Sequence, residues 1–505
     1  MDVSLFIKNG LVLSSADAVP QIADIKIEGN QIVEVGQTTA SNSDHVIDAS
    51  GLLLAPGLIN GHFHSHEHFH KGRYDNLPLE LWMHFVRPPV GAEPLTPEQV
   101  YLRTMIGAIE ALRTGTTFVV DDVNHAPWFS QDCIDAVFRA YQDIGLRALV
   151  SVSLFDLPFH RSVPFFDEEM PAVIRQPLDT QPPPDRDRLL DLAKHLAHQH
   201  HPQRHRVGYI VAPSAPQRCS DTFLLQLHQL AEQQNLPMMM HVLETRLQAV
   251  TAGLLYQRSM VAHLAELGIL SPRLALQHCV WSTANDIEHL ANAGSSAVYN
   301  PLSNLKLGSG QMPLRHFIQA GVNVALASDG CGSRDSVNML SVVQATALLN
   351  KSPQTLPAQW LSAEEAFRLG TEGGARAFGY ADRLGRIEPG YLADIVGYRL
   401  STPAFIPLNH PLRQLVYAET GCAVDLVVSD GIAVMQHGQL TQINESALIA
   451  EILSTHQSLL RSLEASEAAV SQLLPYYRRI CDRCRTVPVD PDIVTWDNHP
   501  SGSTA

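Results

Sequence analysis

The chain has 505 residues, of which 45% are hydrophobic and 17% are charged, a balance typical of a folded enzyme and not of a disordered chain. Its net charge of −16 argues against a general nucleic-acid binder, because there is no excess of Lys and Arg to displace phosphate counterions. The seven cysteines are scattered along the chain and do not suggest a disulfide framework.

The first residues contain no basic leader followed by a long apolar stretch. No run approaches the roughly 20 apolar residues that a membrane-spanning helix needs. We therefore expect a cytoplasmic protein without a membrane partner.

Both ends of the chain contain short alternating runs separated by turn residues. Residues 1–55 have this pattern, and it returns over residues 385–442. Such runs predict hairpin strands. We expect one small β-sandwich domain built from residues 1–55 and 385–442.

The central region, residues 56–384, alternates apolar runs with stretches of helical spacing. The eight apolar runs cover residues 52–64, 117–122, 147–155, 207–213, 237–244, 274–280, 296–301 and 323–330. Alternating strands and helices predict a parallel sheet, and eight repeats predict an α/β fold of the (β/α)8 TIM-barrel type. In such a barrel the active site lies at the C-terminal ends of the strands.

Three segments fall outside this pattern. An insertion over residues 156–206 contains a proline-rich loop that is expected to start a helix ending near His200. Residues 443–486 are expected to form a helical C-terminal extension, which either packs on the barrel or forms a homo-oligomer interface. Residues 487–505 are rich in Pro, Asp, Ser and Gly and predict a disordered tail.

Polar residues that can bind metal or move protons end four of the central runs. His62 and His64 end the first run as a His-x-His pair, and His241, His278 and Asp329 end later ones. His62 and His64 point the same way if they lie on one strand. A single strand-end histidine is more often a core residue, but four such coincidences favour a site.

The proposed metal ligands are His62, His64, His241 and Asp329. Three imidazoles and a carboxylate suit one divalent metal ion such as Zn²⁺, and these ligand types also allow Fe²⁺. A metal there would lower the pKa of a bound water to roughly 7. We expect Asp329 also to take up the water proton, Glu244 to act as a general acid, and His278 to orient the attacking group or stabilise an oxyanion.

The chain resembles the metal-dependent amidohydrolase superfamily, in the branch of chlorohydrolases and aminohydrolases that act on N-heterocycles. The similarity covers about residues 3–440. It rests on these motifs: PGLINGHFH (56–64), LPLELW (77–82), HVLET (241–245), QHCVW (277–281), NPLSNLKLGSG (300–310), SDG (328–330) and GYLADIV (390–396). S-adenosylhomocysteine/methylthioadenosine deaminases and triazine hydrolases belong to this branch.

The resemblance implies a mononuclear site with the ligands named above, and it places Trp82 in the substrate pocket. Asn304, within the 300–310 motif, and Ser214 are the other expected substrate contacts. Nucleoside deaminases of the branch usually have Ala-Pro-His-Ser-Pro before the third metal ligand, whereas residues 212–216 read APSAP. Ser214 therefore replaces a histidine that touches the substrate, which weakens the expectation of an adenosine-type substrate.

The leading hypothesis is a zinc-dependent deaminase of a purine, pyrimidine, pterin or triazine type of N-heterocycle. The same site could instead expel chloride or hydrolyse an amide or guanidine, since only the leaving group differs. A catalytically silent binding scaffold is a third hypothesis, and the complete residue set argues against it. His66, His68 and His70 are expected at the pocket rim or a helix start, and the Cys481/Cys484 pair has no predicted role.

Overall fold

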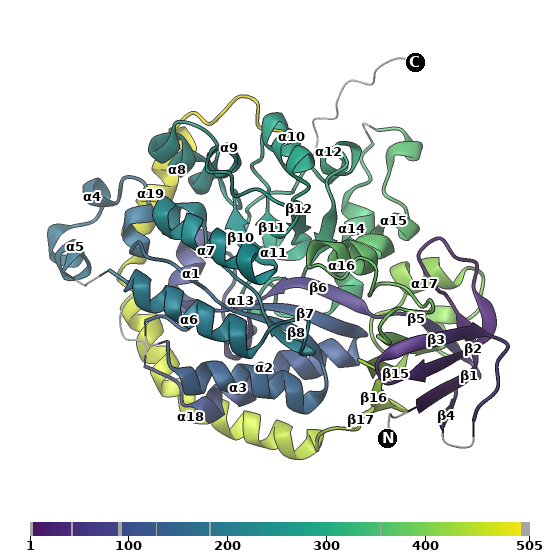
Figure 1. The fold of residues 1–505 in the computed structure, drawn as a ribbon. Helices are drawn as coiled ribbons and strands as arrows, with labels where there is room; N and C mark the ends of the chain where they lie inside the picture. The colour runs from purple at the N-terminus through teal and green to yellow at the C-terminus, as the bar shows by residue number, and fades with distance from the viewer. Residues whose placement is uncertain are drawn as a thin grey trace.

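The computed structural model describes residues 4–41, 44–88, 93–127, 129–180, 183–353 and 355–495. The fold is mixed α/β, with two four-stranded parallel sheets surrounded by helices and a nine-stranded sheet beside them (Figure 1). All pairings within the two smaller sheets are parallel.

The eight parallel strands fall in the eight predicted runs and are almost wholly buried. The first sheet contains, in spatial order, β6 (Leu58–Phe63), β7 (Thr116–Val123), β8 (Arg147–Val152) and β9 (Val207–Tyr209). The second contains β10 (Met238–Val242), β11 (Leu274–His278), β12 (Ser296–Tyr299) and β13 (Val324–Leu326).

The two parallel sheets approach each other at both edges. Val211, just after β9, forms a parallel bridge with Met238 of β10. At the other edge, the Asp329 amide after β13 donates a 3.0 Å hydrogen bond to the His62 carbonyl of β6. The C-terminal ends of β6 and β13 therefore lie side by side.

The predicted run over residues 52–64 forms two strands in different sheets. β5 (Leu52–Pro56) pairs antiparallel with β14 (Ile395–Arg399) in the nine-stranded sheet, whereas β6 joins the parallel strands. Gly57 lies between them, and a Cβ there would come within 2.0 Å of Thr117 Oγ1. Only glycine fits this close passage from one sheet to the other.

Both ends of the chain contribute to the nine-stranded sheet, as predicted. Its remaining strands are β1 (Ser4–Val12), β2 (Gln21–Glu28), β3 (Gln31–Gly36), β4 (His45–Asp48), β15 (Val424–Ser429), β16 (Ile432–Gln436) and β17 (Gln439–Leu440). Arg147 of β8 joins this sheet to the parallel strands through a buried bidentate ion pair with Asp394, with both N–O distances at 3.0 Å.

Helices alternate with the parallel strands. They are α2 (Pro97–Arg113), α3 (Gln131–Ile144), α6 (Arg186–Gln199), α7 (Asp221–Gln234), α8 (Arg246–Tyr256), α9 (Met260–Glu266), α10 (Ala284–Ala293), α11 (Pro301–Lys306), α12 (Leu314–Gln319), α13 (Cys331–Arg334) and α14 (Met339–Leu349). α2 starts with the local chemistry expected from the sequence, because Thr96 and Gln99 form a capping box and Pro97 occupies the first turn. In the described part of the chain, α15 (Ala363–Arg368), α16 (Gly374–Ala377) and α17 (Pro411–Tyr417) lie between α14 and the C-terminal extension.

The insertion over residues 156–206 contains two short helices before α6. These are α4 (Phe166–Glu169) and α5 (Ala172–Asp179). α6 ends at Gln199, close to the predicted end, and the Asp185 side chain caps its first turn by accepting from the Arg188 amide.

Two helices occupy the C-terminal extension. α18 (Glu445–Ser471) runs along α2, and α19 (Leu474–Thr486) reaches α1 (Leu79–Val86) and α8 (Figure 1). The prediction of disorder over 487–505 is wrong for residues 487–495. There the Val494 amide donates to the Ser282 carbonyl, and the Ala284 amide donates to the Asp492 carbonyl. Residues 496–505 lie outside the described residues.

No helix in the described ranges is long and apolar enough to cross a membrane.

Candidate active site

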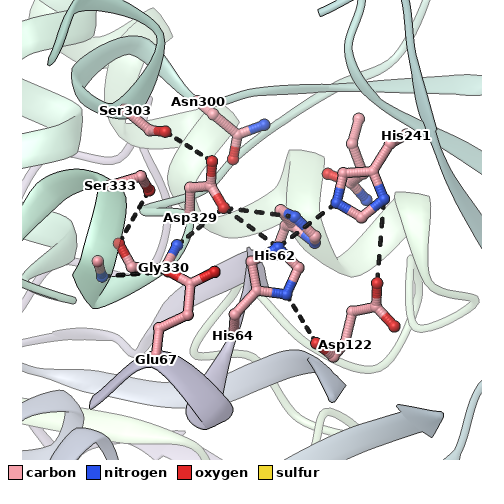
Figure 2. A network of polar contacts seen from close by, with 12 residues as sticks. His62, His64, Glu67, Asp122, His241, Asn300, Ser303, Asp329, Gly330 and Ser333 are labelled. Atoms are coloured by element: carbon pink, nitrogen blue, oxygen red, sulfur yellow. Dashed lines mark hydrogen bonds and ion pairs between the residues drawn. The ribbon is translucent and has the colours of Figure 1, made fainter. Parts of the chain in front are cut away.

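The predicted site residues meet at the C-terminal ends of the parallel strands (Figure 2). His62 lies near the end of β6, and His64 follows it at the start of the 3-10 helix η1 (Ser65–His70). His241 lies on β10, His278 ends β11, and Asp329 follows β13. His62 and Asp329, more than 250 positions apart in sequence, therefore meet because their strands end at the same side of the parallel sheets.

Three imidazoles and one carboxylate surround a common point. Asp329 Oδ1 lies 3.6 Å from His62 Nε2 and 3.4 Å from His64 Nε2. His241 Nε2 lies 3.4 Å from His64 Nε2. Among the described residues, His62, His64 and Asp329 form one group whose ligand atoms lie within 4.8 Å of one another, and His62, His241 and His278 form another.

Backbone carbonyls orient two of these rings. His64 Nδ1 donates to the Asp122 carbonyl at 2.7 Å, and His241 Nδ1 donates to the Ser214 carbonyl at 2.9 Å. With the proton on Nδ1, the Nε2 atoms of both rings carry lone pairs that face each other. Facing lone pairs repel each other unless a cation lies between them.

The histidines are held in their neutral, ligating form. Burial is the main cause that keeps the pKa values of His62 and His64 well below the usual range, and the neighbouring positive charges act in the same direction. Neither ring nitrogen of His62 has a hydrogen-bond partner in the described part of the chain. A buried imidazole with both nitrogens unpartnered is the arrangement that a bound metal ion would satisfy.

Asp329 is positioned in a strained but well-supported conformation. Its backbone φ is 62°, in the left-handed region that an aspartate rarely occupies. Ser303 Oγ donates to Oδ2 at 2.6 Å, and the Gly330 amide donates to Oδ1 at 2.8 Å (Figure 2). Burial acts to raise the pKa of Asp329, but His278, His62 and the Ser303 bond outweigh it and lower that pKa. The carboxylate is therefore ionised at neutral pH.

Glu244 and His278 form a second pair beside this cluster. Glu244 Oε2 lies 3.6 Å from His278 Nε2, and both side chains are buried. Burial and the Asp329 charge raise the pKa of Glu244 well above its ordinary value. Their surroundings therefore shift the pKa values of Asp329 and Glu244 in opposite directions, downward for Asp329 and upward for Glu244.

A pocket opens from the cluster, and it encloses about 860 Å³ when the open solvent at its mouth is counted. Trp82 of α1 lines it, and its indole N–H donates to the Gly332 carbonyl at 2.9 Å. Ser214 also lines the pocket. Asn304 does not: its side chain is fully buried and accepts a 3.0 Å bond from His278 Nδ1. The structure thus places Asn304 beside His278, and its contact with substrate stays a prediction.

A family model described as the amidohydrolase family matches residues 53–434. The chain belongs to the amidohydrolase family. It is 33% identical to the 5-methylthioadenosine/S-adenosylhomocysteine deaminase of Thermococcus sibiricus over 434 residues, which cover 86% of this chain and 94% of the relative.

Two solved structures resemble this amidohydrolase over most of its length. One is an adenosine deaminase from Xanthomonas campestris with bound zinc, at 29% identity and a TM-score of 0.77, covering 96% of this chain and 99% of that one. The other is a triazine hydrolase from Arthrobacter aurescens, at 25% identity and a TM-score of 0.81, covering 90% of this chain and 99% of that one. Both represent the branch that the motifs indicated.

Several pocket residues of this amidohydrolase were not predicted from its sequence. They come from η1, α1, the 3-10 helix η3 (Pro216–Arg218) and α19, and they are Glu67, Glu80, Arg87, Gln217, Arg218 and Tyr477. Except for Glu67, which lies beside His64 and His66, none belongs to a group of possible metal ligands among the described residues, so local patterns did not single them out. The position of Arg218, four residues after Ser214, was the one available signal, since that segment departs from the nucleoside deaminase pattern.

The histidines after His64 separate into two kinds. η1 turns the chain after the strand, as predicted. His66 stays beside the site, with Nε2 at 3.3 Å from Arg87 Nε. His68 and His70 turn away, with their Nδ1 atoms bonded to the Arg103 carbonyl and to the Tyr74 hydroxyl. The 3-10 helix breaks the alternation that would have placed all five histidines on one face.

Proposed function

We propose that this amidohydrolase is a metal-dependent hydrolase that replaces the amino group of an aminated N-heterocycle with oxygen and releases ammonia. The observation that carries the proposal is the convergence of His62, His64, His241 and Asp329 on one point beside the Glu244–His278 pair. The named relatives act on adenosine derivatives, which are aminated heterocycles of this class.

The residues present fit one divalent metal ion, and Zn²⁺ is the ion we propose. His62, His64 and His241 would supply nitrogens and Asp329 an oxygen. The fit rests on the unpartnered nitrogens of His62 and on the facing Nε2 lone pairs of His64 and His241. When bound, such an ion supplies Lewis-acid chemistry that makes a water more acidic.

The carboxyl groups would divide the proton transfers between them. Asp329, ionised and next to the ligand nitrogens, accepts a proton from the attacking water and later delivers it to the departing amino group. Glu244, whose pKa is raised by burial, donates a proton to the ring nitrogen next to the carbon under attack. Protonation makes that carbon electron-poor, so the water oxygen forms a C–O bond there while the ring C=N bond opens to a single bond. When the bond to the protonated amino group breaks and ammonia leaves, the ring N–H returns its proton to Glu244 and the C=N bond reforms.

His278 would orient the water. Its Nδ1 proton is committed to Asn304 Oδ1, so Nε2 carries a lone pair and accepts a hydrogen bond. Asn304 is a positioning residue in this scheme, because it fixes the tautomer of His278.

We infer that the eight parallel strands form one closed (β/α)8 barrel over residues 56–384. The Val211–Met238 bridge and the Asp329–His62 hydrogen bond, one at each junction of the two sheets, support this reading. We further infer that the nine-stranded sheet folds over as a β-sandwich domain of residues 1–55 and 385–442. Side chains of β1, β2 and β15 share one buried cluster there.

Ammonia release tests the function. The zinc-loaded protein is incubated with aminopurines, aminopyrimidines, aminopterins and aminotriazines, with the Glu244→Gln variant as the blank. Ammonia from at least one ring class, absent in the blank, is the expected result. Chloride release from a chlorinated triazine, without ammonia from any amine, would assign the other leaving group instead. Zinc binding with no product of either kind would refute the proposal.

A further inference from the structure

Two guanidinium groups line the pocket that contains His241 and Glu244. Arg87 follows the last residue of α1, and Arg218 ends η3. Arg87 Nε donates a 3.3 Å hydrogen bond to Nε2 of His66, two residues after His64, so only its terminal guanidinium nitrogens remain for a ligand. Arg218 follows the segment whose Ser214 carbonyl orients His241. Both cations therefore lie close to the reacting centre.

Arg218 is a buried cation with an unused donor. The residue is 8% exposed, and its Nε has no hydrogen-bond partner in the part of the chain that the structure describes. Its guanidinium packs 4.3 Å from the ring centre of Phe155 and 5.1 Å from that of Phe159. Burial and the charge of Arg87 lower the pKa of Arg218 to about 10, so the group remains charged at neutral pH.

The carboxyl groups of the pocket form no close ion pair with these cations in the described part of the chain, although the Arg87 charge acts on Glu67 and Glu244 from a longer distance. Within the described ranges, no carboxylate oxygen lies within 4.0 Å of a nitrogen of either arginine. Glu67 accepts from the Gly332 amide, and Glu80 accepts from the Thr245 hydroxyl. Glu244 faces His278. The carboxyl groups thus have other partners, and an uncompensated buried charge destabilises the empty pocket.

Gln217, next to Arg218, adds an unused acceptor. It is 8% exposed and lines the same pocket, and its buried Oε1 meets no donor among the residues that the structure describes. An amide oxygen in that position is complementary to a ring or exocyclic N–H. The η3 turn therefore presents one N–H acceptor and one cation side by side.

We propose that Arg87 and Arg218 bind an anionic group, a carboxylate or a phosphate, carried by the heterocyclic substrate close to its reacting ring. The proposal rests on the proposed function, since it specifies the substrate of that same site. A planar guanidinium matches the oxygen pairs of carboxylate and phosphate, and the Phe155 face holds it flat. Neutral nucleosides, which lack such a group, are not the preferred substrates.

The test measures binding separately from turnover. Zinc-loaded Glu244→Gln protein is titrated calorimetrically with two matched pairs, pterin against pterin-6-carboxylate and adenosine against its 5′-monophosphate. We expect the anionic member of one pair to bind about 10- to 100-fold more tightly than its neutral partner, the range of charge-assisted hydrogen bonds. The pair that shows the preference identifies the anion as carboxylate or phosphate.

Substitution of the arginine should remove that preference. In the same background, Arg218→Gln should bring the affinity ratio close to one while leaving the neutral member's affinity unchanged. The matched control is Arg161→Gln in the insertion, because Arg161 is exposed and ion-paired with Asp179 at 2.9 Å. It should keep the full ratio. If Arg218→Gln does not fold, Arg87→Gln at the half-buried end of α1 makes the same measurement.

The outcomes separate this proposal from the proposed function. Equal affinities within both pairs would overturn the anion site even if the wild-type protein releases ammonia. A preference that survives both arginine substitutions would also overturn it. Anion-selective binding without ammonia or chloride release from any substrate would support the anion site and refute the proposed function.

Discussion

Glu244→Gln separates proton donation from metal binding more cleanly than any other substitution in the site. Glutamine keeps the size of the side chain and removes the acidic proton. Oε2 is 3.6 Å from His278 Nε2, too far for a hydrogen bond, so no ring contact is broken. The backbone amide of residue 244 keeps its 2.8 Å bond to Gln248 Oε1. We therefore expect an unchanged local fold and full zinc content.

Turnover should fall by roughly 10²- to 10⁴-fold, the contribution of a positioned general acid. The assay is ammonia release under saturating substrate, with zinc content measured on the same sample. Glu80→Gln is the matched control, because Glu80 is a second pocket carboxyl whose pKa is raised by burial but which bonds Thr245 instead of facing His278. It should retain turnover within roughly tenfold of wild type.

We also expect the Glu244→Gln variant to differ from wild type in how its free energy of unfolding depends on pH. The pKa of Glu244 is raised in the fold by burial, so the protonated form is favoured there, and its ionisation opposes folding. This contribution is fully present below the unfolded pKa of roughly 4.3 and is lost as the pH rises toward the folded pKa. For the metal-free protein, the melting temperature of Glu244→Gln should match that of wild type near pH 4 and exceed it at pH 8. Near-normal turnover, or a melting difference independent of pH, would refute the reasoning.

Three further substitutions test other parts of the structure. His241→Ala removes one proposed ligand nitrogen and should abolish stoichiometric zinc, measured by metal analysis after dialysis; full zinc retention would exclude His241 as a ligand. Ser303→Ala removes the 2.6 Å bond to Asp329 Oδ2 and should raise the pKa of Asp329, so the acid limb of the kcat/KM profile moves to higher pH; an unmoved limb would contradict this. Arg147→Met leaves the buried Asp394 carboxylate without its ion-pair partner. The free energy of unfolding, measured in urea, should fall by about 3–5 kcal/mol. A decrease of less than about 1 kcal/mol would show that water hydrogen-bonds to the carboxylate in place of Arg147.

Local sequence patterns were enough to predict the eight parallel strands and the position of the site. Apolar runs ending in His62, His241, His278 and Asp329 are short-range features, and parallel strands present their C-terminal ends on one side of the sheet. The prediction that these residues meet therefore needed no knowledge of loops. The strands of the nine-stranded sheet could also be predicted, because the alternating residues and turn residues that indicate hairpins at both chain ends are again local features.

Tertiary structure alone decided what surrounds that site. The run over 52–64 reads as one apolar segment, and its division between two sheets depends on the close packing of Gly57 against Thr117. Asn304 lies in a motif that suggested substrate contact, yet its orientation toward His278 depends on where α11 packs.

The residues of the pocket wall could not be predicted from local sequence patterns either. Arg87, Arg218 and Tyr477 come from three segments separated by more than a hundred residues each, and they line one pocket. The sequence by itself determined the positions of the proposed metal ligands and proton-transfer residues, because strand periodicity places them. The other residues of the pocket wall lie on loops and helices whose mutual positions depend on long-range packing, and only the folded chain brings them together.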